Sequence, residues 1–216
     1  MNRLERGVPR LYLVIGGMAP ERLLRLVDEA VRGGVDCVQL REKDLSTRAF
    51  VARARLLRPL LGARGVPLII NDRLDVALAS QADGVHLGQD DLEVGMVRRH
   101  MPQAIIGLSV GSLDELEAAA AYDVDYLSPS PVFDTPSKAD AGPALGLQGV
   151  RAMRQRSRRP LLAIGGIDSG NAQAVLEAGA DGIAVVRAIT AAPDPVAASS
   201  ELAGIVRRAR DAQAPT

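Results

Sequence analysis

Carboxylates stand after two neighbouring apolar runs of the chain. The stretch INDRLDVALASQADGVHLGQDD places Asn71 and Asp72 after the first run, and Asp90 and Asp91 shortly after the second. One Asn or Asp after a strand is typical of a helix N-cap. Two carboxylates at matching positions also suit Mg²⁺, which takes one or two carboxylates, several waters and the oxygens of a substrate phosphate. We therefore predict that Asp72 and Asp91 bind one Mg²⁺, and that Asp90 is secondary because adjacent side chains rarely face the same way.

Basic groups follow another apolar run, in the motif QLREK. Gln39, Arg41 and Lys43 occupy alternate positions, which share one face of an extended chain. A solvated strand end, with Glu42 offsetting the charge, is one interpretation. The other is a guanidinium and an ammonium directed at phosphate oxygens. Lys138 lies in a long loop rich in Pro, Gly and Ser, and a loop of this length in a compact domain is typical of a functional segment.

A glycine pair follows a late apolar run, in AIGGIDSGNA. Glycines let backbone N–H groups approach an anion at a helix N-terminus, so Gly165 and Gly166 predict a phosphate site, although glycines also relieve tight turns. Arg187, after the last run, is predicted to face the same phosphate. His86 is interpreted as a hydrogen-bonded core histidine rather than a catalytic base.

The elements that must position these residues alternate along the chain. The motifs RGGVDCVQL, SQADGVHLG, AAYDVDYLS and EAGADGIAVV each join a helix-like segment to a strand-like run through a turn residue and an Asp. Eight strand-like runs are predicted, over residues 11–15, 37–40, 67–70, 84–87, 104–108, 125–128, 160–164 and 182–186. The intervening segments are mostly amphipathic, with Ser or Asp near their starts. Strict alternation in eight units favours a closed (β/α)₈ TIM barrel over an open doubly wound sheet.

Length and charge limit the possible partners. The 216 residues suit a single barrel domain, 1–216, and 26 basic residues balance 26 acidic ones, so nucleic acid and membrane surfaces are not expected partners. With no signal-peptide core or membrane span, a cytoplasmic protein is expected. The single Cys37 predicts a buried apolar thiol without a disulfide, and two histidines make a zinc site improbable. A homo-oligomer is left open.

Five motifs, QLREK, INDR, GVHLGQDD, PVFDTPSK and IGGI, stand in an order and spacing that resembles the thiamine-phosphate synthase family over nearly the whole chain. The resemblance implies a (β/α)₈ barrel with Mg²⁺. It also implies an enzyme that joins hydroxymethylpyrimidine diphosphate to a thiazole phosphate and releases diphosphate.

The resemblance also implies site residues. Those expected at the pyrimidine diphosphate are Gln39, Leu40, Arg41, Glu42, Lys43, Asn71, Ser109 and Lys138, with Arg41, Lys43, Ser109 and Lys138 taking part in catalysis. Those expected at the thiazole phosphate are Thr135, Pro136, Ser137, Gly166, Val186 and Arg187. Asp72 and Asp91 are expected on Mg²⁺.

Three positions depart from the family pattern. Gly111 stands where a histidine is common, Ser130 where a glycine precedes the proline, and Arg187 where a serine often contacts the thiazole phosphate. The related thiazole tautomerases resemble this chain too, but they replace the proline of the PVF run with a histidine and do without the metal carboxylates. Pro131 and the two aspartates favour the synthase. A barrel that binds phosphate ligands without catalysis is the third alternative, which the retained aspartates and basic groups disfavour.

Overall fold

Eight parallel strands form one closed ring. The computed structural model describes residues 8–135 and 142–213. The strands are β1 (Leu11–Ile15), β2 (Cys37–Leu40), β3 (Leu68–Asn71), β4 (Gly84–Leu87), β5 (Ile105–Val110), β6 (Tyr126–Pro129), β7 (Leu162–Ile164) and β8 (Gly182–Val185). They pair in the order β6-β5-β4-β3-β2-β1-β8-β7, and a parallel bridge between Leu127 and Leu161 joins the two ends. The predicted (β/α)₈ barrel is confirmed, because an open doubly wound sheet has no such closure.

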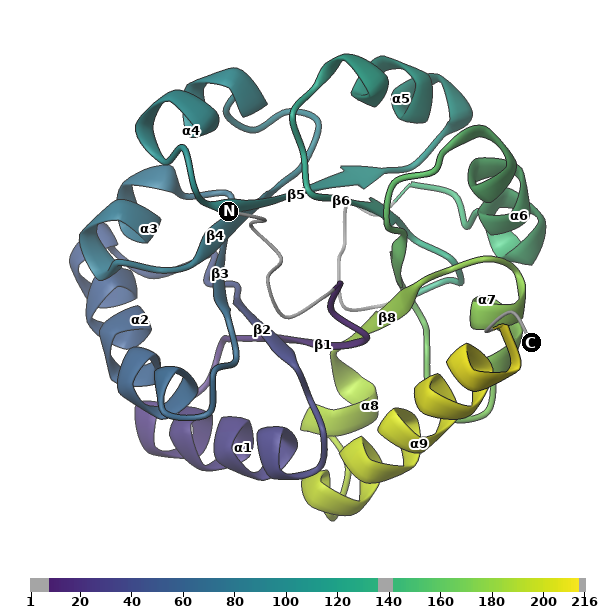
Figure 1. Cartoon of the computed structure of the whole chain (residues 1–216). Helices are drawn as coiled ribbons and strands as arrows, with labels where there is room; N and C mark the ends of the chain where they lie inside the picture. The colour runs from purple at the N-terminus through teal and green to yellow at the C-terminus, as the bar shows by residue number, and fades with distance from the viewer. Residues whose placement is uncertain (1–7, 136–141, 214–216) are drawn as a thin grey trace.

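Helices surround the ring on its outside (Figure 1). They are α1 (Pro20–Arg32), α2 (Thr47–Gly62), α3 (Leu74–Ser80), α4 (Val94–His100), α5 (Leu113–Ala118), the 3₁₀ turn η1 (Ala119–Ala121), α6 (Gly146–Arg156), α7 (Ala172–Glu177), α8 (Arg187–Thr190) and α9 (Pro195–Gln213). Serines cap two of them as expected: the Ser46 hydroxyl accepts from the N–H of Ala49 in α2, and Ser112 accepts from the N–H of Glu115 in α5. Within the described part of the chain, no helix is long and apolar enough to cross a membrane.

Alternation along the strands makes two cores. One set of side chains, with Leu13, Val38 and Ile70 among them, packs outward against the helices. The other set points into the barrel and forms a separate apolar cluster that includes Cys37, Ile69 and Leu162. Cys37 is buried and has no disulfide, as its sequence context predicts.

The Asp of the recurring sequence motif holds neighbouring strands together at the amino-terminal end of the barrel. Asp36, Asp83, Asp125 and Asp181 each precede an even-numbered strand, and each accepts from a backbone N–H at the start of the preceding odd-numbered strand. Three of these carboxylates also pair with an arginine of an even-numbered helix: Arg58 with Asp83, Arg98 with Asp125, and Arg154 with Asp181. The recurring motif is therefore a structural clamp at the end of the barrel that lies away from the predicted site.

Candidate active site

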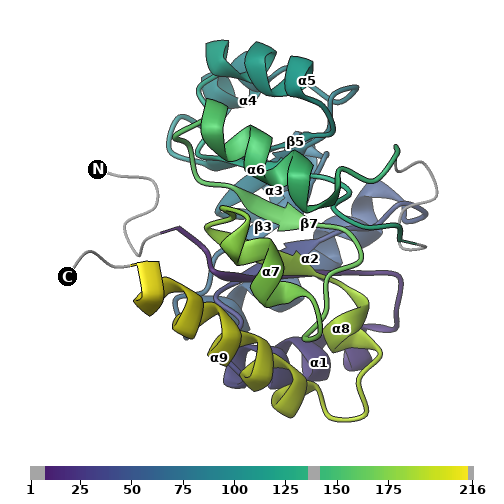
Figure 2. The same cartoon turned by 90° about the vertical axis from the view of Figure 1, so that its right-hand side faces the viewer.

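The predicted site residues that the structure describes lie at the carboxyl ends of the strands or in the loops that follow them. In Figure 2 the arrow of β7 points to the right, toward the side where the loop after β6 also lies. The far end of α9 lies on the opposite side. Parallel strands deliver all their carboxyl ends to one mouth of a barrel, so loops distant in sequence meet there.

Lys43, Asp72 and Asp91 meet at this mouth from the loops after β2, β3 and β4. The Lys43 ammonium donates to Oδ2 of Asp72 at 2.7 Å, with the two side chains 52% and 20% exposed. Partial burial, followed by the contact with Asp72, raises the pKa of the Asp91 carboxyl. Two carboxylates therefore crowd together beside one ammonium, an arrangement that a cation stabilises.

Neither carboxylate caps a helix. The N-cap of α3 is Arg73 and that of α4 is Glu93, and neither cap residue makes a side-chain cap bond. Asp91 instead accepts from the backbone N–H of Gly88 at 2.6 Å, which fixes its own loop. Asp72 has φ +61°, a left-handed backbone that is uncommon outside glycine and that clusters at functional sites.

The carboxylate pair fits Mg²⁺ better than a metal with a complete protein shell. Among the described residues, no group of three or more His, Cys, Asp or Glu side chains is placed to hold a metal ion. Two carboxylates are the number that Mg²⁺ uses when waters and phosphate oxygens supply the remaining ligands.

The QLREK segment divides between the two faces of its strand. Gln39 points into the barrel and is 4% exposed, and its Nε2 donates to the Tyr12 hydroxyl. Leu40 is completely buried in the cluster that faces the helices, so its side chain lies outside the mouth. Arg41 is half-buried and Lys43 exposed, just beyond the strand.

Glu42 has a structural role within the same segment. Its carboxylate is 3% exposed and accepts from Arg53 of α2 at 2.6 Å and from the backbone N–H of Gly17 at 3.1 Å. The chain is closely packed here, because a Cβ at Gly16 would lie 1.8 Å from the Arg41 carbonyl oxygen. Glu42 thus holds the loops after β1 and β2 together, and the expectation of substrate contact applies at most to its backbone.

A chain of hydrogen bonds crosses the barrel beneath the mouth. Ser109 of β5 bonds to Nε2 of His86 at 2.9 Å, and Nδ1 of His86 bonds to the Tyr126 hydroxyl at 2.9 Å. Tyr126 bonds to Tyr12 at 3.1 Å, and Tyr12 accepts from Gln39 at 3.1 Å. His86 is a buried, hydrogen-bonded histidine, as its sequence position predicts. The two tyrosines were not among the predicted residues, although both are polar residues at inward positions of apolar strands.

The other half of the mouth contains the glycine turn after β7. Gly165 and Gly166 have φ of +109° and +62°, and Cβ atoms there would lie 2.6 Å from Pro131 and 2.8 Å from Phe133. The N–H groups of Val132 and Phe133 donate to the carbonyls of Ile164 and Gly165. The glycines therefore let residues 131–134 lie directly on the turn, and Thr135 is the last described residue of that segment.

The glycine turn does not open a helix, contrary to the sequence prediction. The next helix, α7, begins only at Ala172, because Asp168 and Asn171 fold the intervening residues into a turn of their own. Asn171 also donates from Nδ2 to the Gly166 carbonyl at 2.9 Å. A phosphate at Gly166 would therefore meet loop backbone rather than the start of α7.

Val186 and Arg187 leave β8 beside this turn. The pairing of Ile164 with Ala184 brings Gly166 and Val186, two residues further on, to the same end of neighbouring strands. Val186 packs on the interior cluster, whereas Arg187 is exposed at the first position of the short helix α8. Pro136, Ser137 and Lys138 lie outside the described residues.

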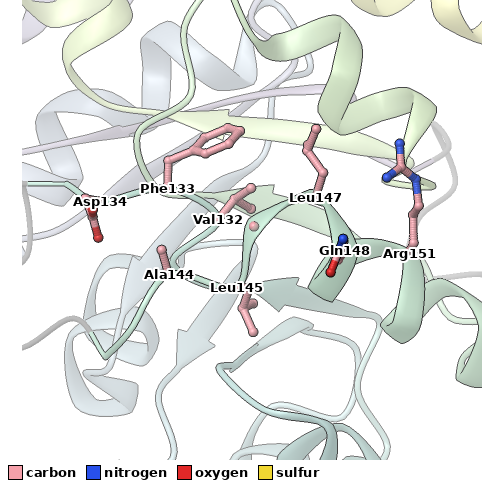
Figure 3. Close-up of a pocket in the computed structure, with 9 residues that line it drawn as sticks. Val132, Phe133, Asp134, Ala144, Leu145, Leu147, Gln148 and Arg151 are labelled. Carbon is pink, nitrogen blue, oxygen red and sulfur yellow. The ribbon is translucent and has the colours of Figure 1, made fainter.

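A hollow of about 750 Å³ lies beside the segment 132–135 (Figure 3). It is lined from that segment, from α6 and from the two residues before α6, with Asp134 and Arg151 at opposite ends in the view. None of its lining residues is a predicted site residue, and the lining flanks the undescribed positions 136–141. The predicted charged residues Lys43, Asp72 and Asp91 meet at the mouth of the barrel and not in this hollow.

Comparisons with known proteins agree on one family. The family model described as thiamine monophosphate synthase matches residues 11–189. Thiamine-phosphate synthase of Albidiferax ferrireducens is 51% identical over 200 residues, covering 91% of each chain. That of Azorhizobium caulinodans is 49% identical, covering 93% of this chain and 96% of its own.

A solved structure agrees with the sequence relatives. Thiamine phosphate pyrophosphorylase from Pyrococcus furiosus superposes with a TM-score of 0.84 at 36% identity, covering 96% of this chain and 98% of its own. Orotidine 5'-phosphate decarboxylase from Pyrococcus horikoshii shares the fold alone, with a TM-score of 0.68 at 18% identity. With a family match over most of its length and relatives near 50% identity, this chain belongs to the thiamine monophosphate synthase family.

Proposed function

We propose that this protein is a thiamine-phosphate synthase, a transferase that joins hydroxymethylpyrimidine diphosphate to a thiazole phosphate and releases diphosphate. The observation that carries the proposal is the meeting of Lys43, Asp72 and Asp91 at the mouth of a barrel of this family. A site for a diphosphate leaving group needs positive charge and a place for a divalent cation, and these three residues supply both.

The pyrimidine diphosphate is assigned to the side of the mouth formed by β2 to β5. Arg41 and Lys43, with Lys138, offer charged donors to the diphosphate oxygens, while Asn71 and Ser109 offer an amide and a hydroxyl. Gln39 offers its amide from inside the barrel wall. Leu40 and Glu42 contribute through the backbone that their buried side chains hold in place.

The thiazole phosphate is assigned to the side formed by the segments after β6, β7 and β8. Thr135, Gly166 and Val186 lie on these segments, and Pro136 and Ser137 continue the first of them. Arg187 offers a guanidinium for the phosphate.

Asp72 and Asp91 would hold Mg²⁺. When bound, this ion supplies positive charge against the diphosphate oxygens. The ion pair of Lys43 with Asp72 indicates that the two carboxylates attract a cation. With Mg²⁺ in that place, the Lys43 ammonium would be free to contact the substrate. The chain's own task is electrostatic: it orients the diphosphate and stabilises the charge that grows on it.

The reaction is then a substitution at the pyrimidine methylene carbon. The bond from that carbon to the diphosphate oxygen breaks, and the electron pair leaves with diphosphate. The aminopyrimidine ring shares the positive charge until the lone pair of the thiazole nitrogen forms the new C–N bond. Arg41, Lys43 and Lys138 stabilise the departing charge, so the reaction needs no activated protein nucleophile.

A turnover assay tests the proposal. Purified protein is mixed with both substrates, and thiamine phosphate and diphosphate are measured with Mg²⁺ and with excess chelator. We expect equal amounts of the two products with Mg²⁺, and neither product with chelator. Conversion of the thiazole without diphosphate release would instead indicate a tautomerase. Binding of both substrates without turnover would indicate a non-catalytic barrel.

A further inference from the structure

The hydrogen-bonded chain inside the barrel joins two groups that the proposed function assigns to the substrate. The chain, called here the interior relay, consists of Gln39, Tyr12, Tyr126, His86 and Ser109. Gln39 and Ser109 stand at its two ends, on β2 and β5. The three middle residues are buried, at 8% exposure or less, and do not belong to the predicted site.

The barrel is built around the relay. Gly107 of β5 has no side chain, and a Cβ there would lie 2.1 Å from the Tyr126 ring, so the glycine makes room for that ring. The rings of His86 and Tyr126 stack with centroids 5.6 Å apart, and Tyr12 meets Tyr126 edge to face at 6.0 Å. These contacts fix the ring orientations on which the hydrogen bonds depend.

The relay has a direction, because each hydroxyl has one proton to give. Burial raises the pKa of Tyr12 and of Tyr126 well above the usual value, so both stay protonated at neutral pH. The 3.1 Å contact between the two tyrosines fits either hydroxyl as donor, but Tyr12 already accepts from the Gln39 amide, which leaves its own proton for the Tyr126 oxygen. The Cys37 thiol also lies beside Tyr12, but sulfur is the weaker acceptor.

The direction fixes the tautomer of His86. With Tyr126 as the donor to Nδ1, an imidazole that carries one proton carries it on Nε2 and donates it to the Ser109 oxygen, and both 2.9 Å contacts fit this tautomer. Ser109 is thereby an acceptor within the protein, and its own hydroxyl proton remains for another acceptor at the mouth.

We propose that the interior relay positions Ser109 as an obligate donor to the bound pyrimidine diphosphate, with Tyr12, Tyr126 and His86 as positioning residues. The proposal rests on the proposed function, which assigns that substrate to Ser109. The acceptor is an oxygen of the diphosphate or a ring nitrogen of the pyrimidine, and both have lone pairs for one O–H donor. With the reversed tautomer, the Nδ1 proton of His86 would point at the Tyr126 proton. Ser109 would then donate to Nε2 of His86 and would have only lone pairs left for the substrate.

Nitrogen NMR of the histidines tests the direction without any assay of activity. The chain has two histidines, and the second, His100, bonds through Nδ1 to the Met96 carbonyl near the end of α4. His100→Gln leaves one signal set to assign. We expect neutral His86 with its proton on Nε2 in the unliganded protein. A proton on Nδ1, or an average of the two tautomers, would overturn the proposal.

Tyrosine variants test the consequence for the substrate. Tyr126→Phe keeps the ring and removes one hydroxyl, and the matched control Tyr122→Phe changes an exposed tyrosine near η1. We expect Tyr126→Phe to give mixed His86 tautomers and to lower kcat/KM for the pyrimidine diphosphate about tenfold, as for one hydrogen bond. The KM of the thiazole phosphate should stay constant, and Tyr122→Phe should match the parent.

A double variant separates positioning from mere stability. Ser109→Ala removes the last hydroxyl of the relay, so adding Tyr126→Phe to that variant should cause almost no further loss of kcat/KM. If Tyr126→Phe acted through stability alone, the two fold-losses of kcat/KM would multiply. Multiplying effects, or an unchanged kcat/KM in folded Tyr126→Phe, would refute the proposal. If the parent protein lacks synthase activity but His86 keeps the expected tautomer, the proposed function fails while the relay's direction stands.

Discussion

At the scale of single residues, the adjacent Asp90 and Asp91 are expected to have different roles: Asp91 binds the metal, and Asp90 is a surface charge. Asp90 and Asp91 are both exposed, but Asp91 accepts from the backbone N–H of Gly88 and lies against Asp72. We predict that Asp91→Asn, like Asp72→Asn, lowers turnover on the order of 100-fold and raises the Mg²⁺ concentration needed for half-activity. Asp90→Asn is the matched control and should behave as the parent. Identical Mg²⁺ titrations of parent and Asp91→Asn would remove Asp91 from the metal site.

Arg187 is the departure from the family pattern that most directly concerns a substrate. It is exposed at the start of α8, beside the Gly166 turn. A charge-assisted contact with the thiazole phosphate is worth about 1.5–3 kcal/mol, so Arg187→Ser should raise the KM of that substrate by roughly 10- to 150-fold. The KM of the pyrimidine diphosphate should stay the same, and Arg207→Ser on α9 serves as control. If neither KM changes, the phosphate is held by the turn alone.

Sequence predicts these residues unevenly, for a physical reason. Polar groups that follow an apolar run are conspicuous, so Lys43, Asp72 and Asp91 are found from sequence, and the barrel brings them together. Glu42 also follows an apolar run, but its carboxylate forms an ion pair with Arg53 of α2. The spacing of the two residues in the sequence does not predict this pair. Tyr126 was missed because an inward aromatic residue looks like core until its hydrogen bonds are known.

At the scale of elements, the strands were predicted closely and the turns less well. All eight predicted runs overlap a strand, with boundaries shifted by at most two residues, because apolar β-branched runs between turn residues are a strong signal. The glycine turn has the sequence pattern of a helix start, but no helix begins there. Its glycines are required instead by the close approach of residues 131–134, a tertiary contact without a local sequence signal.

Gly165 tests that interpretation of the turn. Alanine there would adopt φ +109° and place its Cβ 2.6 Å from Pro131, so Gly165→Ala should lower the free energy of unfolding by about 2–4 kcal/mol. Gly95→Ala in α4, where no atom lies within 4 Å, should instead stabilise by about 0.5 kcal/mol. Urea unfolding of both variants measures the difference. Equal stability of the two would mean that the turn accommodates a side chain.

Two departures from the family pattern lie side by side, at the ends of β5 and β6. A Cβ at Gly111 would lie 3.2 Å from the Ser130 carbonyl oxygen, and the Ser130 N–H donates to the Val110 carbonyl. Compared with the family pattern, this chain thus lacks a side chain at Gly111 and has an additional one at Ser130, which lies beside it. The two departures form one local change at the mouth rather than two independent ones.

At the scale of the whole molecule, the barrel divides its carboxylates between two rims. Asp72 and Asp91 stand at the carboxyl ends of strands, where loops converge and a cation can bind. The clamp residues, of which Asp36 and Asp83 are examples, bond to backbone N–H groups at the opposite rim. The same residue type therefore supports chemistry at one end and strand registration at the other, so only its position relative to the strands distinguishes the two roles.

Asp36 gives the clamp rim a measurable pH dependence. Burial raises the pKa of Asp36 from 3.8 to about 6, although the backbone N–H groups of Arg10 and Leu11 favour the charged form. Between these two values the native protein keeps a proton that the unfolded chain has released. A rise in pH from 4 to 7 therefore lowers the free energy of unfolding through this group, by on the order of 3 kcal/mol.

Asp36→Asn removes this titration, because an amide does not ionise. The variant loses a hydrogen-bond acceptor at every pH, but its deficit against the parent should shrink as the pH rises from 4 to 7, since only the parent then carries the cost of a partly buried charge. Urea unfolding at several pH values in this window measures the difference between the two proteins. Asp211→Asn, at an exposed position of α9, should run parallel to the parent throughout. A deficit of Asp36→Asn that stays constant with pH would show that the two backbone donors, rather than burial, control Asp36, and that the clamp rim is as stable charged as neutral.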